Sequence, residues 1–197
     1  GEDKEESVGL FAKINQAYIK NLNLNFSAGE FSTANAIYSG GLAGRITNSV
    51  VINITLDGTN TTIQGANMVG GLAGLVEGQS LIYGVSSNLS VSTILSNTTE
   101  LYNPTKQANS SDNSYAKTLS YAGGIVGVAD LTTRSYSRED FNFSYLYINE
   151  NGVSSNESLT ILADYAGGVA GYVGKNVKAL RLSFNVGSNN RINGQYV

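Results

Sequence analysis

Three features of the sequence predict an all-β chain, wound as a right-handed parallel β-helix (a β-solenoid) of about five degenerate coils with two polar loop insertions. A glycine-rich motif recurs along the 197 residues. Segments of alternating apolar and polar residues follow most copies of the motif, which is typical of strands with one buried face. No stretch keeps the apolar period of a helix, and abundant Asn, Gly, Thr and Ser residues oppose helix formation.

The recurring motif consists of two glycines, an aliphatic residue, a small residue and a third glycine. Its second glycine serves as the anchor of each copy, and a weaker copy opens the chain. The anchors are Gly9, Gly41, Gly71, Gly124 and Gly168, which are 32, 30, 53 and 44 residues apart. The first two spacings give the basic period, and the last two contain that period plus an insertion. A unit of about 30 residues cannot bury its own hydrophobic face, so each unit is predicted to stack on the next.

We therefore expect a polar lead-in at residues 1–7 and a single domain over residues 8–197. Its repeats are expected at residues 8–37, 38–67, 68–120, 121–164 and 165–197. The clearest alternating strands are residues 22–26, 50–56 and 180–184. Three pairs are interpreted as corners between solenoid faces rather than as hairpin turns of a sandwich: Asp57-Gly58, Asn151-Gly152 and Asn193-Gly194.

The positions around each anchor predict which side chains face inward. After Gly71, Leu72, Gly74 and Val76 share one face, and every copy repeats this order of an aliphatic, a tiny and an apolar residue. We assign this face to the interior, with the tiny residue where another wall of the coil passes close. The position four after the anchor varies and is predicted to point outward; it is Lys13, Arg45, Leu75, Val128 or Tyr172. The residues three positions before the anchors are expected to stack as a ladder of Tyr38, Met68, Tyr121 and Tyr165. We expect this ladder to contribute to core packing rather than to bind a ligand.

Two polar insertions are predicted to interrupt the repeats. The first lies between about Ile94 and Lys117, and the second covers residues 130–140 and 149–158. Both follow the same kind of anchor, so both are expected to emerge on related sides of the rod. Tyrosines among Ser and Asn suit a binding surface, although surface decoration without a ligand is the alternative. The candidate ligand-binding residues are Tyr102, Tyr115 and Tyr136.

Composition and charge exclude several classes of function. The net charge is −3 and charged residues make up 14% of the chain, so no nucleic-acid partner is expected. Lys175, Lys178 and Arg181 are interpreted as a solvated strand face. The chain has no cysteine and no histidine, which excludes disulfides, a thiol nucleophile and a Ser-His-Asp triad. No catalytic, metal or cofactor site is predicted, because Asp57, Asp130 and Asp164 stand at different offsets from the anchors and calcium-repeat motifs are absent.

The units Gly41-Leu42-Ala43-Gly44 and Gly71-Leu72-Ala73-Gly74, each followed by an alternating strand, resemble the GLUG motif, a repeat named for its Gly-Leu-x-Gly core. The departures from this core are Ile125 and Val169 in place of leucine, and Ala12 in place of the last glycine. GLUG repeats occur in bacterial surface proteins, including adhesin-like and autotransporter-passenger-like proteins. The resemblance, over residues 38–197, implies a β-helix-like passenger, surface exposure and adhesion, and it transfers no catalytic residue.

The sequence thus predicts a non-enzymatic bacterial cell-surface domain that presents loops or a flat face to a glycan or protein ligand. Its expected location is extracellular, with any signal or membrane anchor outside these residues. The domain is expected either to be a fragment of a longer chain or to carry an improvised cap at its end. The alternatives are a glycan-active β-helix enzyme and a pure structural spacer of a larger surface protein.

Overall fold

The computed structural model describes residues 7–27, 29–33, 36–94, 119–131, 146–155, 159–175, 177–188 and 190–194. These residues form strands and turns, with no helix among them, which confirms the predicted all-β class. Their strands pair in parallel and form four sheets, here called A to D. Within the same ranges, no helix has the length and apolarity needed to cross a membrane.

Each sheet collects one part of every repeat. Sheet A contains β1 (Ser7–Val8), β5 (Tyr38–Gly40), β9 (Met68–Gly70), β13 (Tyr121–Gly123) and β18 (Tyr165–Gly167). Sheet B contains β2 (Phe11–Asn15), β6 (Ala43–Thr47), β10 (Ala73–Glu77), β14 (Val126–Asp130) and β19 (Ala170–Val173). Sheet C contains β3 (Tyr18–Asn25), β7 (Val50–Asp57), β11 (Leu81–Ser87), β15 (Leu146–Asn149), β16 (Gly152–Ser155), β20 (Val177–Leu180) and β21 (Ser183–Val186). Sheet D contains β4 (Gly29–Thr33), β8 (Thr61–Gly65), β12 (Ser90–Thr93), β17 (Thr160–Leu162) and β22 (Arg191–Asn193).

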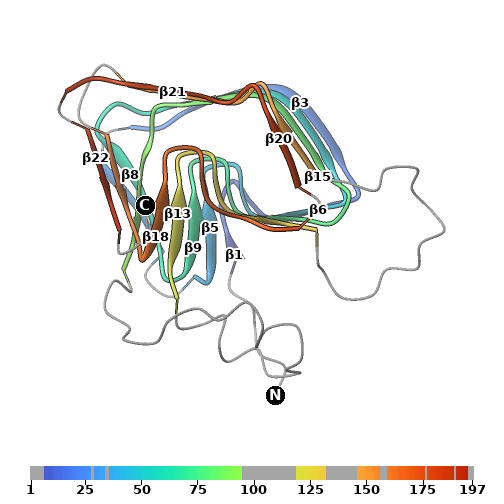
Figure 1. Ribbon diagram of the computed structural model, residues 1–197, viewed down its shortest axis with the longest axis horizontal. Coiled ribbons are helices and arrows are strands. Elements are labelled where there is room, and N and C mark those ends of the chain that lie inside the picture. The colour runs from blue at the N-terminus through green and yellow to red at the C-terminus, as the bar shows by residue number, and fades with distance from the viewer. Residues whose placement is uncertain are drawn as a thin grey trace.

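The chain runs through sheets A, B, C and D in turn and then re-enters sheet A beside its previous strand (Figure 1). The register follows the repeats, since Ala43 pairs with Ala73 and Ala73 with Val126 in sheet B. Hydrogen bonds therefore join successive circuits of the chain rather than neighbouring segments of one circuit. This stacked parallel arrangement is that of a β-solenoid-like fold.

A continuous hydrophobic core lies between the sheets. The aliphatic position after the anchor is 0% exposed at Leu42, Leu72 and Ile125, which confirms its inward assignment in these copies. Leu10 and Val173 hold the equivalent register positions but are 56% and 44% exposed. Both lie in or beside β2 and β19, the outermost strands of sheet B, which have a stacked neighbour on one side only among the described residues.

Glycines at the bend between sheets A and B let the two backbones touch. A Cβ atom added at Gly70 would lie 2.1 Å from the carbonyl oxygen of Ala73. One added at Gly74 would lie 2.4 Å from the carbonyl oxygen of Met68, which belongs to sheet A. Real side chains do not approach backbone atoms so closely, so no other residue fits without movement of the backbone. The prediction that another wall passes close to the tiny residue is confirmed, and sheet A is that wall.

A second apolar cluster, separate from the main core, lies where sheets A and B meet. The expected ladder is confirmed in register, because sheet A aligns Tyr38, Met68, Tyr121 and Tyr165. Tyr121 is 4% exposed and stacks on Tyr165 with ring centroids 5.1 Å apart, so the ladder contributes to packing. Leu75 and Val128, expected to point outward, lie outside the main core but are only 8% and 7% exposed. They are buried because both side chains pack in the cluster with the ladder.

Sheet C bends in the middle of each circuit. Equivalent residues at this bend all have a positive φ, and we call them the corner rank: Asn21, Asn53, Gly84, Glu150 and Arg181. Gly and Asn adopt this left-handed conformation more readily than other residues. Beside the bend, the buried Asn151 side chain accepts a hydrogen bond from the Val85 N–H at 2.9 Å and donates one to the Ile82 carbonyl oxygen at 3.4 Å. These bonds satisfy backbone groups that the bend takes out of the sheet.

The two insertions leave the sheets at different corners. Residues 95–118 connect sheet D to sheet A, whereas residues 132–145 connect sheet B to sheet C. The expectation that both emerge on related sides was therefore wrong, because they interrupt different turns of the circuit. Residues 149–155, expected in the second insertion, instead contribute strand residues that pair with β11 and with β20 or β21. Asp57-Gly58 and Asn151-Gly152 lie at corners between strands, as predicted.

Candidate functional site

The tyrosines predicted to bind a ligand, Tyr102, Tyr115 and Tyr136, lie outside the described residues, and their role stays a prediction. Within the described residues, a different surface has binding character. It is the outer side of sheet C before the bend, where equivalent side chains from successive strands form two rows, or ranks. The first rank consists of Tyr18, Val50, Leu81, Tyr147 and Lys178. The second consists of Lys20, Ile52, Tyr83, Asn149 and Leu180, and we call the two ranks together the tyrosine face.

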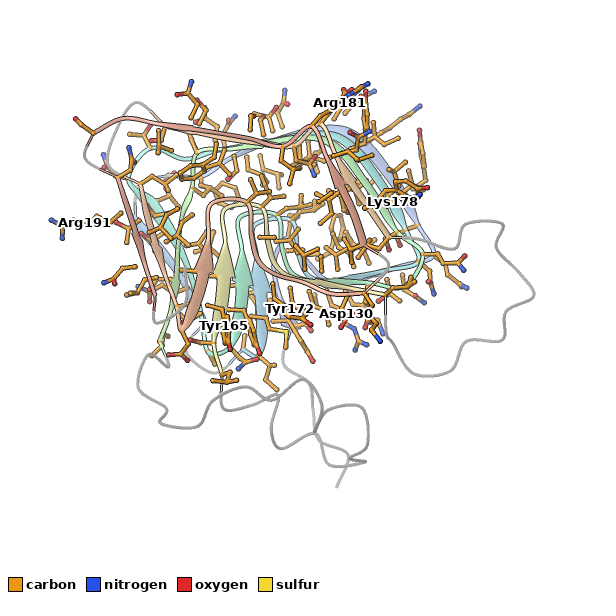
Figure 2. All side chains as sticks on the ribbon, viewed as in Figure 1. Asp130, Tyr165, Tyr172, Lys178, Arg181 and Arg191 are labelled. Carbon is orange, nitrogen blue, oxygen red and sulfur yellow. The ribbon has the colours of Figure 1, made fainter. Side chains whose placement is uncertain are left out.

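The tyrosine face points outward because the residues between its members are buried. Val51 and Ile82 are 0% exposed, Ile148 is 1% exposed, and all three belong to the main core. Side chains alternate along a strand, so their neighbours lie on the opposite side of the sheet. Figure 2 shows Lys178 on this outer side and Arg181 at the bend beside it.

The centre of the tyrosine face is apolar and its two ends carry cations. Val50, Ile52 and Leu81, from the middle strands, are partly exposed aliphatic side chains. At one end the Lys20 Nζ atom lies 5.5 Å from the centroid of the Tyr18 ring, which is 59% exposed. At the other end the Lys178 Nζ atom lies 5.5 Å from the centroid of the Tyr147 ring. Cations over aromatic rings attract the ring quadrupole, so both contacts help to order the tyrosines.

A hydrogen-bonded network lies beside the tyrosine face, at the bend. The Tyr83 hydroxyl donates to Glu150 Oε2 at 2.5 Å, and Arg181 Nη1 donates to Glu150 Oε1 at 2.6 Å. The hydrogen bond from Tyr83, followed by the one from Arg181, lowers the pKa of Glu150, because both bonds favour the carboxylate. The hydrogen bond to Glu150 raises the pKa of Tyr83, because the phenol must keep its proton to donate it.

Beyond the bend, the outer side of sheet C is polar, and we call it the amide face. Its first rank is Asn23, Thr55, Ser86, Gly152 and Ser183. Its second rank includes Asn25, Asp57, Ser154 and Asn185. These short amide and hydroxyl groups suit solvation by water. The amide face therefore offers a matched control surface on the same sheet.

The aspartates considered as candidates for acid–base chemistry do not come together. Asp57 ends β7 and accepts a hydrogen bond from Asn88 Nδ2 at 2.6 Å, beside a surface hollow. Asp130 ends β14, and Asp164 precedes β18 and accepts hydrogen bonds from Ser120 at 3.0 and 2.9 Å. The three carboxylates therefore lie at three different corners.

One pair of acidic residues does lie side by side, since Glu77 is the register partner of Asp130 in sheet B. Glu77 is 1% exposed, forms an ion pair with Arg45 and accepts a hydrogen bond from the Thr47 hydroxyl at 2.9 Å. Its carboxylate thus has the partners that a buried charge needs, and it is interpreted as structural. Among the described residues, no group of three or more His, Cys, Asp or Glu side chains could hold a metal ion.

Sequence reasoning missed the tyrosine face, although a signal for it exists. Three strands of sheet C begin with apolar residues on both faces, as in Val50-Val51-Ile52, Leu81-Ile82-Tyr83 and Leu146-Tyr147-Ile148. An uninterrupted apolar run in a strand indicates a second face that favours contact with another molecule or element.

No protein-family model, curated protein or solved structure matches the chain. Its function is therefore inferred from its own residues and their geometry.

Proposed function

We propose that this chain is a non-enzymatic binding domain of a bacterial cell-surface protein, and that it binds its ligand on the tyrosine face. The observation that carries the proposal is the outward row of tyrosine and aliphatic side chains in sheet C. The rest of the outer side of this sheet, the amide face, is polar. Exposed apolar patches rimmed by polar groups mark interaction sites, and tyrosines combine an apolar ring with a polar tip.

The proposal includes the finer architecture and the surface location. We propose a right-handed coil of five circuits built from GLUG-type repeats, as part of an extracellular adhesin-like chain. The five strands in each of sheets A, B and D support the count, and the strong right-handed preference of parallel crossovers supports the hand. The dispersal of Asp57, Asp130 and Asp164 over three corners disfavours a glycan-cleaving enzyme, which needs two facing carboxylates.

The test is a binding screen of the full chain against arrays of glycans and host extracellular proteins. A tyrosine-face variant carries Tyr18→Ser, Leu81→Ser and Tyr147→Ser, and a matched control carries Thr55→Ala, Ser154→Ala and Asn185→Ala on the amide face. We expect the first variant to lose at least about tenfold in affinity, because stacking and apolar burial are removed, and the control to bind like the parent chain. Circular dichroism checks that both variants keep the fold.

Other results would place the binding site elsewhere or indicate that the chain binds no ligand. Equal binding by both variants would contradict a site on the tyrosine face. If deletion of residues 95–116 abolishes binding while the tyrosine-face variant still binds, the site lies in the first insertion. If no version binds any array member, the chain is a structural spacer.

A further inference from the structure

We infer that the tyrosine face binds a linear polysaccharide that lies along the stacking direction of the strands. This inference rests on the proposed function and names its ligand class. The ranks run across the strands, so their side chains follow one another at about 4.8 Å, and neighbouring ranks are about 7 Å apart. Across the five strand positions that pair in sheet C, the face is therefore about 19 Å long. It is a narrow strip rather than a broad patch.

The size of the strip argues against a globular protein as the ligand. With the width of its side chains included, the tyrosine face covers roughly 300 Å². A stable protein interface buries about 800 Å² on each partner, so the strip is too small to hold a folded protein by itself. It matches the footprint of a single extended chain.

An extended peptide is a poor match for the backbone around the strip. Peptides that bind sheets in extended form add to a free edge, where unpaired N–H and C=O groups give most of the affinity. The tyrosine face lies on the flat of the sheet, and β7 and β11 pair with strands on both sides. Its central strands therefore have no free backbone groups to offer, and recognition must come from side chains.

The side chains of the strip and of its border match the surface of a sugar chain. A pyranose ring presents C–H groups on its flat faces and hydroxyl groups around its rim. Tyr18, Tyr83 and Tyr147 offer aromatic rings for the faces, with aliphatic side chains between them. The corner rank runs alongside and offers amide, carboxylate and guanidinium groups for the hydroxyls. Part of this border is ordered, since Asn53 Nδ2 donates to Asn21 Oδ1 at 3.2 Å and Arg181 pairs with Glu150.

The experiment is calorimetric titration of the full chain with purified linear oligosaccharides, from dimers to octamers, of β-1,4-linked glucose, xylose and N-acetylglucosamine and of 1,4-linked galacturonate. At least one series is expected to bind with an affinity that rises with length and then levels off once the strip is filled. For the longest oligomer of that series, Tyr147→Ser is expected to weaken binding about tenfold, because one stacking ring is lost. Tyr147→Phe keeps the ring and is expected to stay within about threefold of the parent. Asn185→Ala on the amide face serves as the control.

The outcomes separate this inference from the proposed function. If a protein ligand binds through the tyrosine face and no oligosaccharide binds, the polysaccharide is wrong and the proposed function stands. If no ligand of either kind binds, both fail. Oligosaccharide binding that is unchanged in Tyr147→Ser, or dimers that bind as tightly as octamers, would overturn the strip as the binding surface.

Discussion

At the scale of single residues, the bend in sheet C depends on a few side chains with defined partners. Gly84 and Asn53 take the left-handed conformation that suits them, whereas Glu150 and Arg181 take it at a cost. Their ion pair, the hydrogen bond from Tyr83 and the two hydrogen bonds of Asn151 hold the bend in place. The bend matters for function because it separates the tyrosine face from the amide face.

The carboxylate of Glu150 makes the bend sensitive to acid. The pKa of Glu150 is lowered in the folded chain, so its hydrogen bonds to Tyr83 and Arg181 stabilise the fold fully at pH values above the ordinary pKa of 4.5. This stabilisation is lost as the pH falls through the lowered pKa. We expect a carbon-13 NMR titration to place the Glu150 pKa below 4.5, and Tyr83→Phe and Arg181→Gln each to raise it, because each removes a donor. Ser154→Ala is the control. An unchanged Glu150 pKa in both variants would show that the network does not form in solution.

At the scale of elements, the glycine motif is explained by the contact of two sheets. The glycines of the motif are not required by a positive φ, since the positive-φ glycines are Gly29, Gly78 and Gly84 among the described residues. They are required by distance, because the strands of sheets A and B approach each other without room for a Cβ atom. The motif therefore recurs once in every circuit, at the same bend.

A pair of glycine variants tests this explanation. A Cβ atom at Gly123 would lie 2.1 Å from the Val126 carbonyl oxygen, whereas one at Gly152 would meet the movable Ser183 hydroxyl at 2.6 Å. We expect Gly123→Ala to lower the free energy of unfolding by about 3 kcal/mol or more, and Gly152→Ala by less than about 1 kcal/mol. Urea denaturation followed by circular dichroism measures both. Similar losses in the two variants would mean that the close contact at the bend can relax.

At the scale of the whole molecule, stability comes from stacking rather than from local contacts. Middle strands such as β10 have a hydrogen-bonded neighbour on both sides, whereas β2 and β19 have one on a single side among the described residues. The exposure of Leu10 and Val173 at these outer strands follows from the same arrangement. The molecule is therefore expected to open from its outer circuits inward.

Amide hydrogen exchange measures this gradient. We expect the slowest exchange in β6, β10 and β14 and the fastest in β2 and β19, because outer strands open without disrupting the rest of the stack. Uniform protection across sheet B would contradict this expectation and would indicate that the outer strands are covered in solution.

The sequence by itself determined the all-β class, the circuit-to-circuit register of sheets A and B around the anchor glycines, and many of the buried positions. Alternation identifies the inward residues Ile54 and Leu56 of β7, but not Val51, which is inward because the bend at Asn53 interrupts the alternation. The anchor glycines align equivalent residues of successive circuits in sheets A and B. Both signals are local or strictly repeated, so they can be read without coordinates.

Only the tertiary structure decided which outward side chains become neighbours. Alternation within each strand indicates that Tyr18, Leu81 and Tyr147 lie on the opposite side from their inward neighbours. Whether the three side chains become adjacent depends on the loop lengths that set the register of sheet C between circuits. The same holds for Leu75 and Val128, which are buried because sheet A folds back onto sheet B. The physical reason is that the inward face is selected by burial within each strand, whereas the outward face is assembled by stacking strands that are far apart in the chain.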